Sequence, residues 1–563
     1  MMWAARVFTG IFPVPIGCGR AGVFMLAWLL GGAGFAAGPA ASTVPADDRV
    51  VELPPLLVSE RLDWRYVEAP GMAVLSLCPD DITCELVQGV HRLRQLLPLI
   101  LPAEFQNRMT APAELILFDH SDRLMMSKEV MADLLRRSRG SVDAAGRARL
   151  LPTAVQVLPN LRLDDTDVTA TFALLGPETD RDTLRLTKDH MRFLLQSRTP
   201  MLPGWYLEGM MIIFDRTVFE AEAVRIEPLP QVELPAADPA KPPALLPLPA
   251  LFAWRNLPGE VSRRAVVAQS ALFIRWGLDP AQGPGAERFW RLVDRLTGRP
   301  FAEPMIEECL GMTTAEAQQR LMRYAPVATA EPLRLEGGNI TALRGLKPRE
   351  ATKAEIGWLK GDWERLAVAH VSRSHPELVE NYRAQARRTF RRAYETGARD
   401  PRFLAAYGIT ECDAGDPDGR ALGLLEPAAA ARVPRPRAYV ELARLRLAAT
   451  TGKLDAGQLA SVLEPLFAAR AQLPPQLDVF LLGAEAWSRA AVTPAAKHLA
   501  LLNEGLALFP LSGELLWRSA NVYAQFGYRT EAMSLAQLGC QVARNETMRG
   551  RFAQLRDRLA AAK

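Results

Sequence analysis

From about Lys353 to its end the chain is helical in pattern and rich in Ala and Leu, which restricts this part to an all-helical fold. Small and aromatic residues recur along it, as in Ala386-x-x-x-Phe390-x-x-Ala393. Gly505 and Gly539 occupy equivalent places, 34 residues apart. Small residues let paired helices approach closely, and aromatic residues fill the gaps between neighbouring pairs. The pattern predicts antiparallel helix pairs over residues 353–563.

This period and this small/aromatic pattern resemble tetratricopeptide repeats. The resemblance implies a superhelical array with a concave surface, and such surfaces usually bind segments of other proteins. We therefore expect a protein partner that binds through residues 353–563.

The N-terminal segment has the layout of a secretory signal. Arg6 and Arg20 precede an uncharged apolar run over residues 21–37, and small residues follow the run. We expect a signal peptide and leader over residues 1–41, an extension over 42–66, and a periplasmic or secreted product. The alternative is an uncleaved anchor, and membrane attachment is expected only in that case.

Composition excludes some classes of protein. The chain has 563 residues, too many for a single core, so several domains are expected. A net charge of +4 is too small to indicate a nucleic-acid partner. Among the six cysteines no Cys-x-x-Cys pair occurs, which excludes a cysteine zinc cluster. Cys78 and Cys84 are close enough for a local disulfide, but two separate buried thiols remain an equal alternative.

Between these two ends, strand and helix patterns are mixed. Alternating and apolar runs predict strands at residues 72–77, 115–118 and 168–175, and helices at 80–97, 183–196, 205–214, 261–276, 286–296 and 313–324. The predicted units are an α+β subdomain at 67–227, a proline-rich linker or loop at 228–258, a helical subdomain at 259–330 and a connection at 331–352.

One stretch has the layout of a metallopeptidase site. Lys188-Asp189-His190-Met191-Arg192 lies on a predicted helix, and Trp205-Tyr206-Leu207-Glu208-Gly209 begins the next helix. This layout resembles the gluzincin metallopeptidases, in particular the peptidase MA-like domains of exported bacterial proteins. In that family a helix carries His-Glu-x-x-His, and a Trp-Leu-x-Glu-Gly segment supplies the third zinc ligand. The resemblance covers residues 67–325 and implies an α+β zincin-like domain before the helical repeats.

The sequence departs from the family where the metal would bind. Lys188 and Arg192 stand in place of the two ligand histidines, and Asp189 replaces the catalytic glutamate, so that Glu208 is the only ligand position retained. Arginine has no lone pair to donate, and lysine has one only after it loses its proton. We therefore expect no metal, no cofactor and no catalytic residue, that is, a peptidase-like protein without activity. Instead, we expect Lys188 and Arg192 to form ion pairs with Glu208, with the Arg192–Glu208 pair at the centre.

Two other functions remain open at this stage. One is a divergent metal-dependent hydrolase or peptidase with non-standard ligands, and the other is a structural component of the cell envelope.

Two charged clusters also have two interpretations each. The acidic cluster Asp164, Asp165 and Asp167 is either a turn before a strand or a calcium site. The five arginines from Arg383 to Arg392 form either a solvated helix face or a binding site for an acidic partner.

Overall fold

The computed structural model describes most of the chain after residue 62. The described residues are 63–106, 108–119, 161–175, 188–196, 198–230, 245–253, 263–297, 301–337, 340–374, 376–543 and 545–561. The predicted signal segment, residues 1–41, therefore lies outside the described residues.

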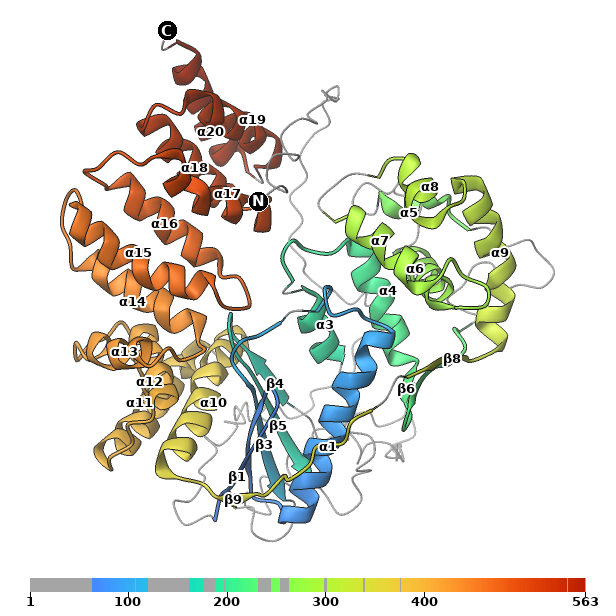
Figure 1. The fold of residues 1–563 in the computed structure, drawn as a ribbon, viewed down its shortest axis with the longest axis horizontal. Helices are drawn as coiled ribbons and strands as arrows, with labels where there is room; N and C mark the ends of the chain where they lie inside the picture. The colour runs from blue at the N-terminus through green and yellow to red at the C-terminus, as the bar shows by residue number, and fades with distance from the viewer. Residues whose placement is uncertain are drawn as a thin grey trace, which may run out of the picture. The chain divides into compact units, whose positions relative to one another are not determined.

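The first part of the fold is built around a mixed six-stranded sheet in the order β4-β5-β3-β2-β1-β9 (Figure 1). Its strands are β1 (Arg65–Ala69), β2 (Met72–Ser76), β3 (Ala113–Asp119), β4 (Leu161–Asp164), β5 (Thr169–Leu175) and β9 (Arg349–Glu350). The strands β2, β3 and β5 are parallel, whereas the pairs β1–β2, β4–β5 and β1–β9 are antiparallel. Parallel neighbours require a crossover connection, which helix α1 (Asp80–Leu96) provides between β2 and β3.

Both faces of the sheet are covered. On one face Val74 and Leu115 share a core with Leu86 and Val87 of α1. Side chains alternate between the two faces of a strand. Ile116, the residue after Leu115, therefore belongs to the other face, whose core includes helices of the C-terminal part. Every residue of β2 is buried, as expected for a strand covered on both sides.

A second core is mainly helical and includes the motif segment. It is formed mainly by α3 (Lys188–Gln196), α4 (Gly204–Asp215), α5 (Leu248–Phe252), α6 (Arg263–Leu278), α7 (Ala286–Arg295), α8 (Pro304–Leu310) and α9 (Thr314–Ala330), with the short η2 (Leu97–Leu99) at its edge. A three-stranded antiparallel sheet in the order β6-β7-β8 joins it, with bounds Thr217–Phe219, Ala223–Ile226 and Leu333–Glu336.

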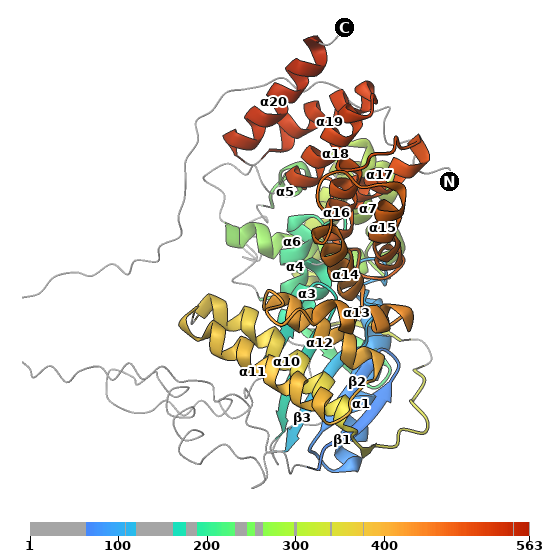
Figure 2. The ribbon, with the colours of Figure 1, turned by 90° about the vertical axis from the view of Figure 1, so that its left-hand side faces the viewer.

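The C-terminal part is a stack of antiparallel helix pairs that follow one another from α10 to α20 (Figure 2). The helices are α10 (Lys353–Ser374), α11 (Val379–Glu395), α12 (Pro401–Asp413), α13 (Ala421–Ala430), α14 (Pro436–Ala448), α15 (Ala456–Arg470), α16 (Leu477–Ser488), α17 (Ala500–Leu508), α18 (Gly513–Gln525), α19 (Arg529–Val542) and α20 (Glu546–Ala561), with short turns η6 (Pro376–Leu378) and η7 (Ala496–Leu499). The predicted helical-repeat fold is therefore confirmed at this level.

The glycines that suggested the repeat lie where helices cross closely. A Cβ atom at Gly505 would lie 2.5 Å from the ring of Phe480, and one at Gly539 would lie 2.3 Å from the ring of Phe552. Likewise, a Cβ atom at Gly361 would lie 2.6 Å from the ring of Phe390. Each aromatic ring thus occupies the space that a larger side chain at the glycine would need.

The stack and the larger sheet share one hydrophobic core. Trp358 and Trp363 of α10 pack in the same buried cluster as Tyr66 and Phe172 of the sheet, and the rings of Phe172 and Trp363 lie 5.1 Å apart. Residues 55–563 correspondingly form one compact unit. The domain boundaries predicted above stay predictions, but the repeats are built onto the sheet.

Two predicted connections contain ordered structure. Within the predicted linker 228–258, helix α5 buries Leu248 and Leu251 in the helical core. The predicted connection 331–352 supplies β8 to one sheet and β9 to the other. The sequence did not reveal α5 because Pro247 precedes the helix and Pro249 lies in its first turn, so the segment resembles the rest of the proline-rich stretch. Cys78 and Cys84 are both thiols in the structure, so the disulfide alternative is not observed.

We predict that Gly539→Ala destabilises the chain and that Gly423→Ala does not. The added methyl group at residue 539 meets the Phe552 ring, and such overpacking costs about 1–3 kcal/mol. Gly423 lies inside helix α13 with no atom near its Cβ position, so alanine there gains up to about 1 kcal/mol of helix propensity. Thermal unfolding followed by circular dichroism measures both effects. Equal melting temperatures for the two variants would contradict the close-packing explanation.

Candidate functional site

The peptidase-like motif lies on two neighbouring helices. Helix α3 begins at Lys188, and α4 begins after Pro203 and packs against α3. The side chains of Lys188 and Asp189 lie outside the described residues. Arg192 is exposed on α3, and Glu208 is about one-third exposed on α4.

Glu208 forms an ion pair with Arg263 and not with Arg192, the partner expected from the sequence. Glu208 Oε1 lies 3.3 Å from Nη2 of Arg263, at the start of α6. Among the described residues, no ion pair joins Arg192 to Glu208. The expected Arg192–Glu208 pair was wrong because α6, a helix outside the motif, supplies the cation that pairs with Glu208. The expected Lys188–Glu208 pair involves a side chain outside the described residues. The pair is exposed, and exposed pairs contribute only about 0–1 kcal/mol.

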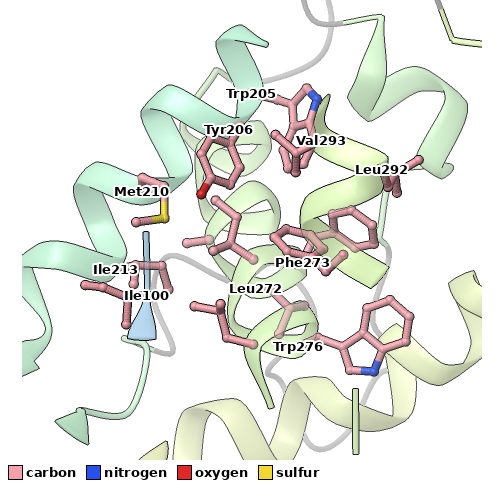
Figure 3. Packing of buried hydrophobic residues seen from close by; sticks show 14 of the residues in the cluster. Ile100, Trp205, Tyr206, Met210, Ile213, Leu272, Phe273, Trp276, Leu292 and Val293 are labelled. Carbon is pink, nitrogen blue, oxygen red and sulfur yellow. The ribbon is translucent and has the colours of Figure 1, made fainter. Parts of the chain in front are cut away.

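The motif residues around Glu208 have clear roles in packing. Trp205 is buried among Tyr206, Phe252 and Phe273, with ring centroids 5.4–5.8 Å from it. Figure 3 shows Trp205 and Tyr206 on α4, pointing into this core. A Cβ atom at Gly209 would lie 2.8 Å from the backbone of Ser270, so glycine allows α4 and α6 to cross closely. These retained residues therefore hold the two helices together.

Two kinds of feature are absent from the described part of the chain. No group of three or more His, Cys, Asp or Glu side chains there is placed to hold a metal ion. Likewise, no described helix is both long enough and apolar enough to cross a membrane.

The acidic cluster before β5 forms a turn, as one of the two interpretations proposed. The Asp165 backbone N–H donates to the Val168 carbonyl at 2.9 Å, which closes the turn between β4 and β5. The carboxylate of Asp165 accepts from Arg365 at 2.7 Å and also from Arg437. Asp167 accepts from the backbone N–H of Arg437 at 2.8 Å. Arginines of the helical stack thus occupy the oxygens that a calcium ion would need.

These contacts belong to a larger buried cluster, which we call the ionic junction. It consists of Asp165, Asp167, Asp362, Asp413, Arg365, Arg435 and Arg437. It joins the β4–β5 turn to helices α10, α12 and α14, which are up to 272 residues away in sequence.

Arg435 lies at the centre of the ionic junction. Its guanidinium donates to Asp362 at 2.6 and 3.2 Å and to Asp167 at 3.2 Å. Its Nη1 atom also lies 4.0 Å from Oε1 of Glu114 on β3. Only 5% of the Arg435 side chain is exposed, and the three carboxylates are fully buried. One cation therefore links the sheet, its turn and the first repeat.

The pKa values of two carboxyl groups in this region are shifted in opposite directions. For Asp165, burial alone favours the protonated form, but the attraction of Arg365 and Arg437 outweighs it and lowers the pKa. For Glu114, burial and the nearby charge of Asp362 raise the pKa well above its usual range. Neither carboxyl oxygen of Glu114 has a hydrogen-bond partner among the residues that the structure describes.

The basic helix α11 is neutralised largely by its own chain. Arg387 contacts Glu411 at 2.7 Å, and Arg391 contacts Asp418 at 2.7 Å. Arg383 pairs with Glu380 one turn earlier. These contacts favour the interpretation of α11 as an ordinary helix face of the repeats over its interpretation as a binding site for an acidic partner.

The helical stack also contains a groove of about 540 Å³ between α13, α14 and α15. We call this space the repeat groove. Tyr439, Leu442 and Arg446 of α14 line it. Its lining also includes Thr110, Glu426, Ala429, Ala430, Arg432, Pro434, Glu464, Pro465, Ala468, Ala471 and Gln472.

Exposed apolar side chains lie on the same helix faces as the groove lining. Leu422 precedes Glu426 by one turn on α13, and Phe467 lies one turn after Glu464 and one turn before Ala471 on α15. Leu422 is 40% exposed and Phe467 is 45% exposed. We call these two exposed side chains, one on α13 and one on α15, the apolar rim of the repeat groove.

Comparisons with known proteins provide little further evidence. No family model and no curated protein matches the chain. Among solved structures, the chain is similar to one described as the crystal structure of the APC/C hetero-tetramer Cut9-Hcn1, with a TM-score of 0.17 and 12% identity. That match covers 55% of this chain and 62% of the other, so this chain spans less than two thirds of its length. Because this TM-score is so low, the helical-repeat assignment rests on the helix pairs described above.

We predict that Glu114→Gln changes how stability depends on pH. With its pKa raised in the folded state, Glu114 contributes stability that is fully present below the ordinary glutamate pKa of about 4.3. That contribution is lost as pH rises through the raised folded pKa. Glutamine does not titrate, so the variant should gain stability relative to the natural chain as pH rises above about 4.3. Urea unfolding followed by tryptophan fluorescence measures this difference.

Asp165→Asn is the matched variant, for which we expect the opposite dependence of stability on pH. The lowered pKa of Asp165 means that its contribution is present above the ordinary aspartate pKa of about 3.9 and is lost as pH falls through the folded pKa. Loss of this partner of Arg365 and Arg437 should cost about 3 kcal/mol at pH 7, and less in acid. Parallel pH profiles for the two variants would show that the ionic junction does not control these carboxyl groups.

Proposed function

We propose that this chain is an exported, non-catalytic protein that retains a gluzincin-like peptidase scaffold and binds a protein partner through its helical repeats. The observation that carries the proposal is the repeat groove with its apolar rim. Exposed Leu422 and Phe467 offer apolar contact area, and the cavity of about 540 Å³ can accept the side chains of a bound segment.

The polar groups of the repeat groove are suited to a polypeptide. Gln472 lines it, and its Oε1 atom is buried without a hydrogen-bond donor among the described residues. An unpaired buried acceptor costs about 1–3 kcal/mol, which the backbone N–H of a bound segment would recover. Arg446 lies between Glu426 and Glu464, 3.5 Å from each, and keeps the groove close to neutral. The proposed partner therefore offers apolar side chains and a free backbone N–H.

The non-catalytic part of the proposal is supported by ligand chemistry. Arg192 cannot coordinate zinc, and Glu208 already pairs with Arg263. Trp205 and Gly209 are retained at positions where packing alone requires them. Export is supported by the pattern of residues 1–41.

We predict that the purified protein, dialysed first against zinc and then against buffer, holds close to no zinc in elemental analysis. The reason is that only one of the three protein ligands expected at such a site is retained. A content near one zinc per chain that disappears in Glu208→Ala would support the alternative function, a metal-dependent hydrolase with non-standard ligands. Glu208→Gln, which keeps the shape of the side chain, controls for misfolding.

We predict that Phe467→Ser weakens partner binding by at least about tenfold, because a bound segment would cover the exposed ring and buried aromatic anchors dominate many interfaces. Leu538→Ser is the matched control, since Leu538 is also exposed, at 37%, but lies on α19 away from the repeat groove. Quantitative pull-down from an extract of the source organism, followed by mass spectrometry, compares the two variants. Equal recovery of the same partners by both would exclude the repeat groove as the binding surface.

A further inference from the structure

A second cavity, of about 360 Å³, lies beside the ionic junction and has no part in the proposed function above. It opens between the β4–β5 turn and helices α10, α11, α12 and α14. Its volume lies at the lower end of the range of about 300–1,000 Å³ typical of small-molecule sites. Its lining combines charged side chains with aliphatic ones.

The charged lining is balanced in sign. Three arginines and three aspartates contribute, namely Arg365, Arg383, Arg437, Asp164, Asp165 and Asp413. A ligand that carried one net charge would leave that charge uncompensated on entry, at a cost in desolvation. A ligand that carries both a positive and a negative group meets an opposite charge for each. The balance therefore favours a small zwitterion.

Two arginines of the lining retain unused hydrogen-bond donors. Within the described residues, Nη2 of Arg365 and Nε of Arg383 are buried without an acceptor. The Arg365 side chain is only 4% exposed, and both arginines line the cavity, so a molecule held in the cavity is the available acceptor. A buried donor of this kind costs about 1–3 kcal/mol, and a carboxylate is the strongest acceptor for a guanidinium. These donors favour a ligand carboxylate.

A spare acceptor is available at the same cavity. Each oxygen of Asp413 accepts one hydrogen bond, from Arg365 or Arg437. A carboxylate accepts about four hydrogen bonds in all, and the Asp413 side chain is 32% exposed. It can therefore accept from a ligand ammonium group without losing either arginine.

The remaining wall is aliphatic. Leu366 and Val368 of α10 face the cavity, as does Val379 of α11. No aromatic side chain lines it among the described residues. This wall suits a branched aliphatic side chain of modest length, because burial of such a side chain stabilises a complex by about 0.8 kcal/mol per CH₂ group.

We propose that this cavity binds an aliphatic α-amino acid as its zwitterion. The α-carboxylate contacts Arg365 and Arg383, the α-ammonium contacts Asp413, and the side chain packs on Leu366, Val368 and Val379. The ligand then lies against the ionic junction, where the sheet and the helical stack meet.

Isothermal titration calorimetry of the full chain tests the site with L-leucine, L-valine, L-isoleucine and L-methionine as probes. Two analogues of leucine each lack one charge, namely 4-methylpentanoate without the ammonium and 3-methylbutylamine without the carboxylate. We expect at least one amino acid of the panel to bind, and both analogues of leucine to bind at least about tenfold more weakly than leucine. No heat of binding for any amino acid up to millimolar concentration would overturn the proposal, and so would equal affinity for either analogue.

Two variants of α10 locate the binding site. Ala369 lines the cavity and takes no part in the ionic junction, so Ala369→Trp should fill the space and abolish binding. The next residue, His370, is exposed and does not line the cavity, so His370→Trp should leave the affinity unchanged. Arg383→Met should weaken binding at least about tenfold while the repeat groove is untouched. Full binding to Ala369→Trp would show that any amino-acid site lies elsewhere on the chain.

Discussion

The guanidinium of Arg435 is the contact on which the arrangement of this protein depends. It is buried and bonded to Asp362 of α10 and Asp167 of the β4–β5 turn, and it lies close to Glu114 of β3. If this cation were removed, several carboxylates would remain buried with less compensation, and breaking a buried pair costs about 3–5 kcal/mol. Its position therefore fixes where the first turns of the repeats meet the sheet.

The shared core explains why so many charges are tolerated there. The face of the sheet that contains Phe172 is covered by Trp358 and Trp363 of α10, which exclude water from the surroundings of the ionic junction. Low local polarity strengthens the ion pairs and raises the cost of leaving any one of them unpaired. The helical stack consequently starts from a rigid base. Both the repeat groove and the smaller cavity lie on the repeats that are closest to this base.

Much of the fold could be predicted from local pattern. The strands β2, β3 and β5 and the helices α1, α4 and α9 follow apolar periods and breaker residues such as Pro203. Gly505 and Gly539 indicated the repeats because close helix crossing requires a small residue at a fixed spacing.

The ionic junction could not be predicted in this way. Arg435 and Asp167 are 268 residues apart, and each considered alone resembles an ordinary surface charge or turn residue. The same limit explains the error at Glu208, whose partner Arg263 lies on a helix 55 residues away. The only available hint was the clustering of Asp164, Asp165 and Asp167 before a strand, which marks a charged turn without naming its partners.

The helical stack depends on the sheet for its stability, because the two share one hydrophobic core. The most direct test is the thermal unfolding of residues 353–563 produced as a separate polypeptide, compared with the full chain by circular dichroism and dye binding. The shared core predicts that the separate stack melts at a markedly lower temperature and binds a hydrophobic dye, because Trp358 and Trp363 lose their cover. A separate stack that melts at the same temperature as in the full chain, without dye binding, would contradict the claim.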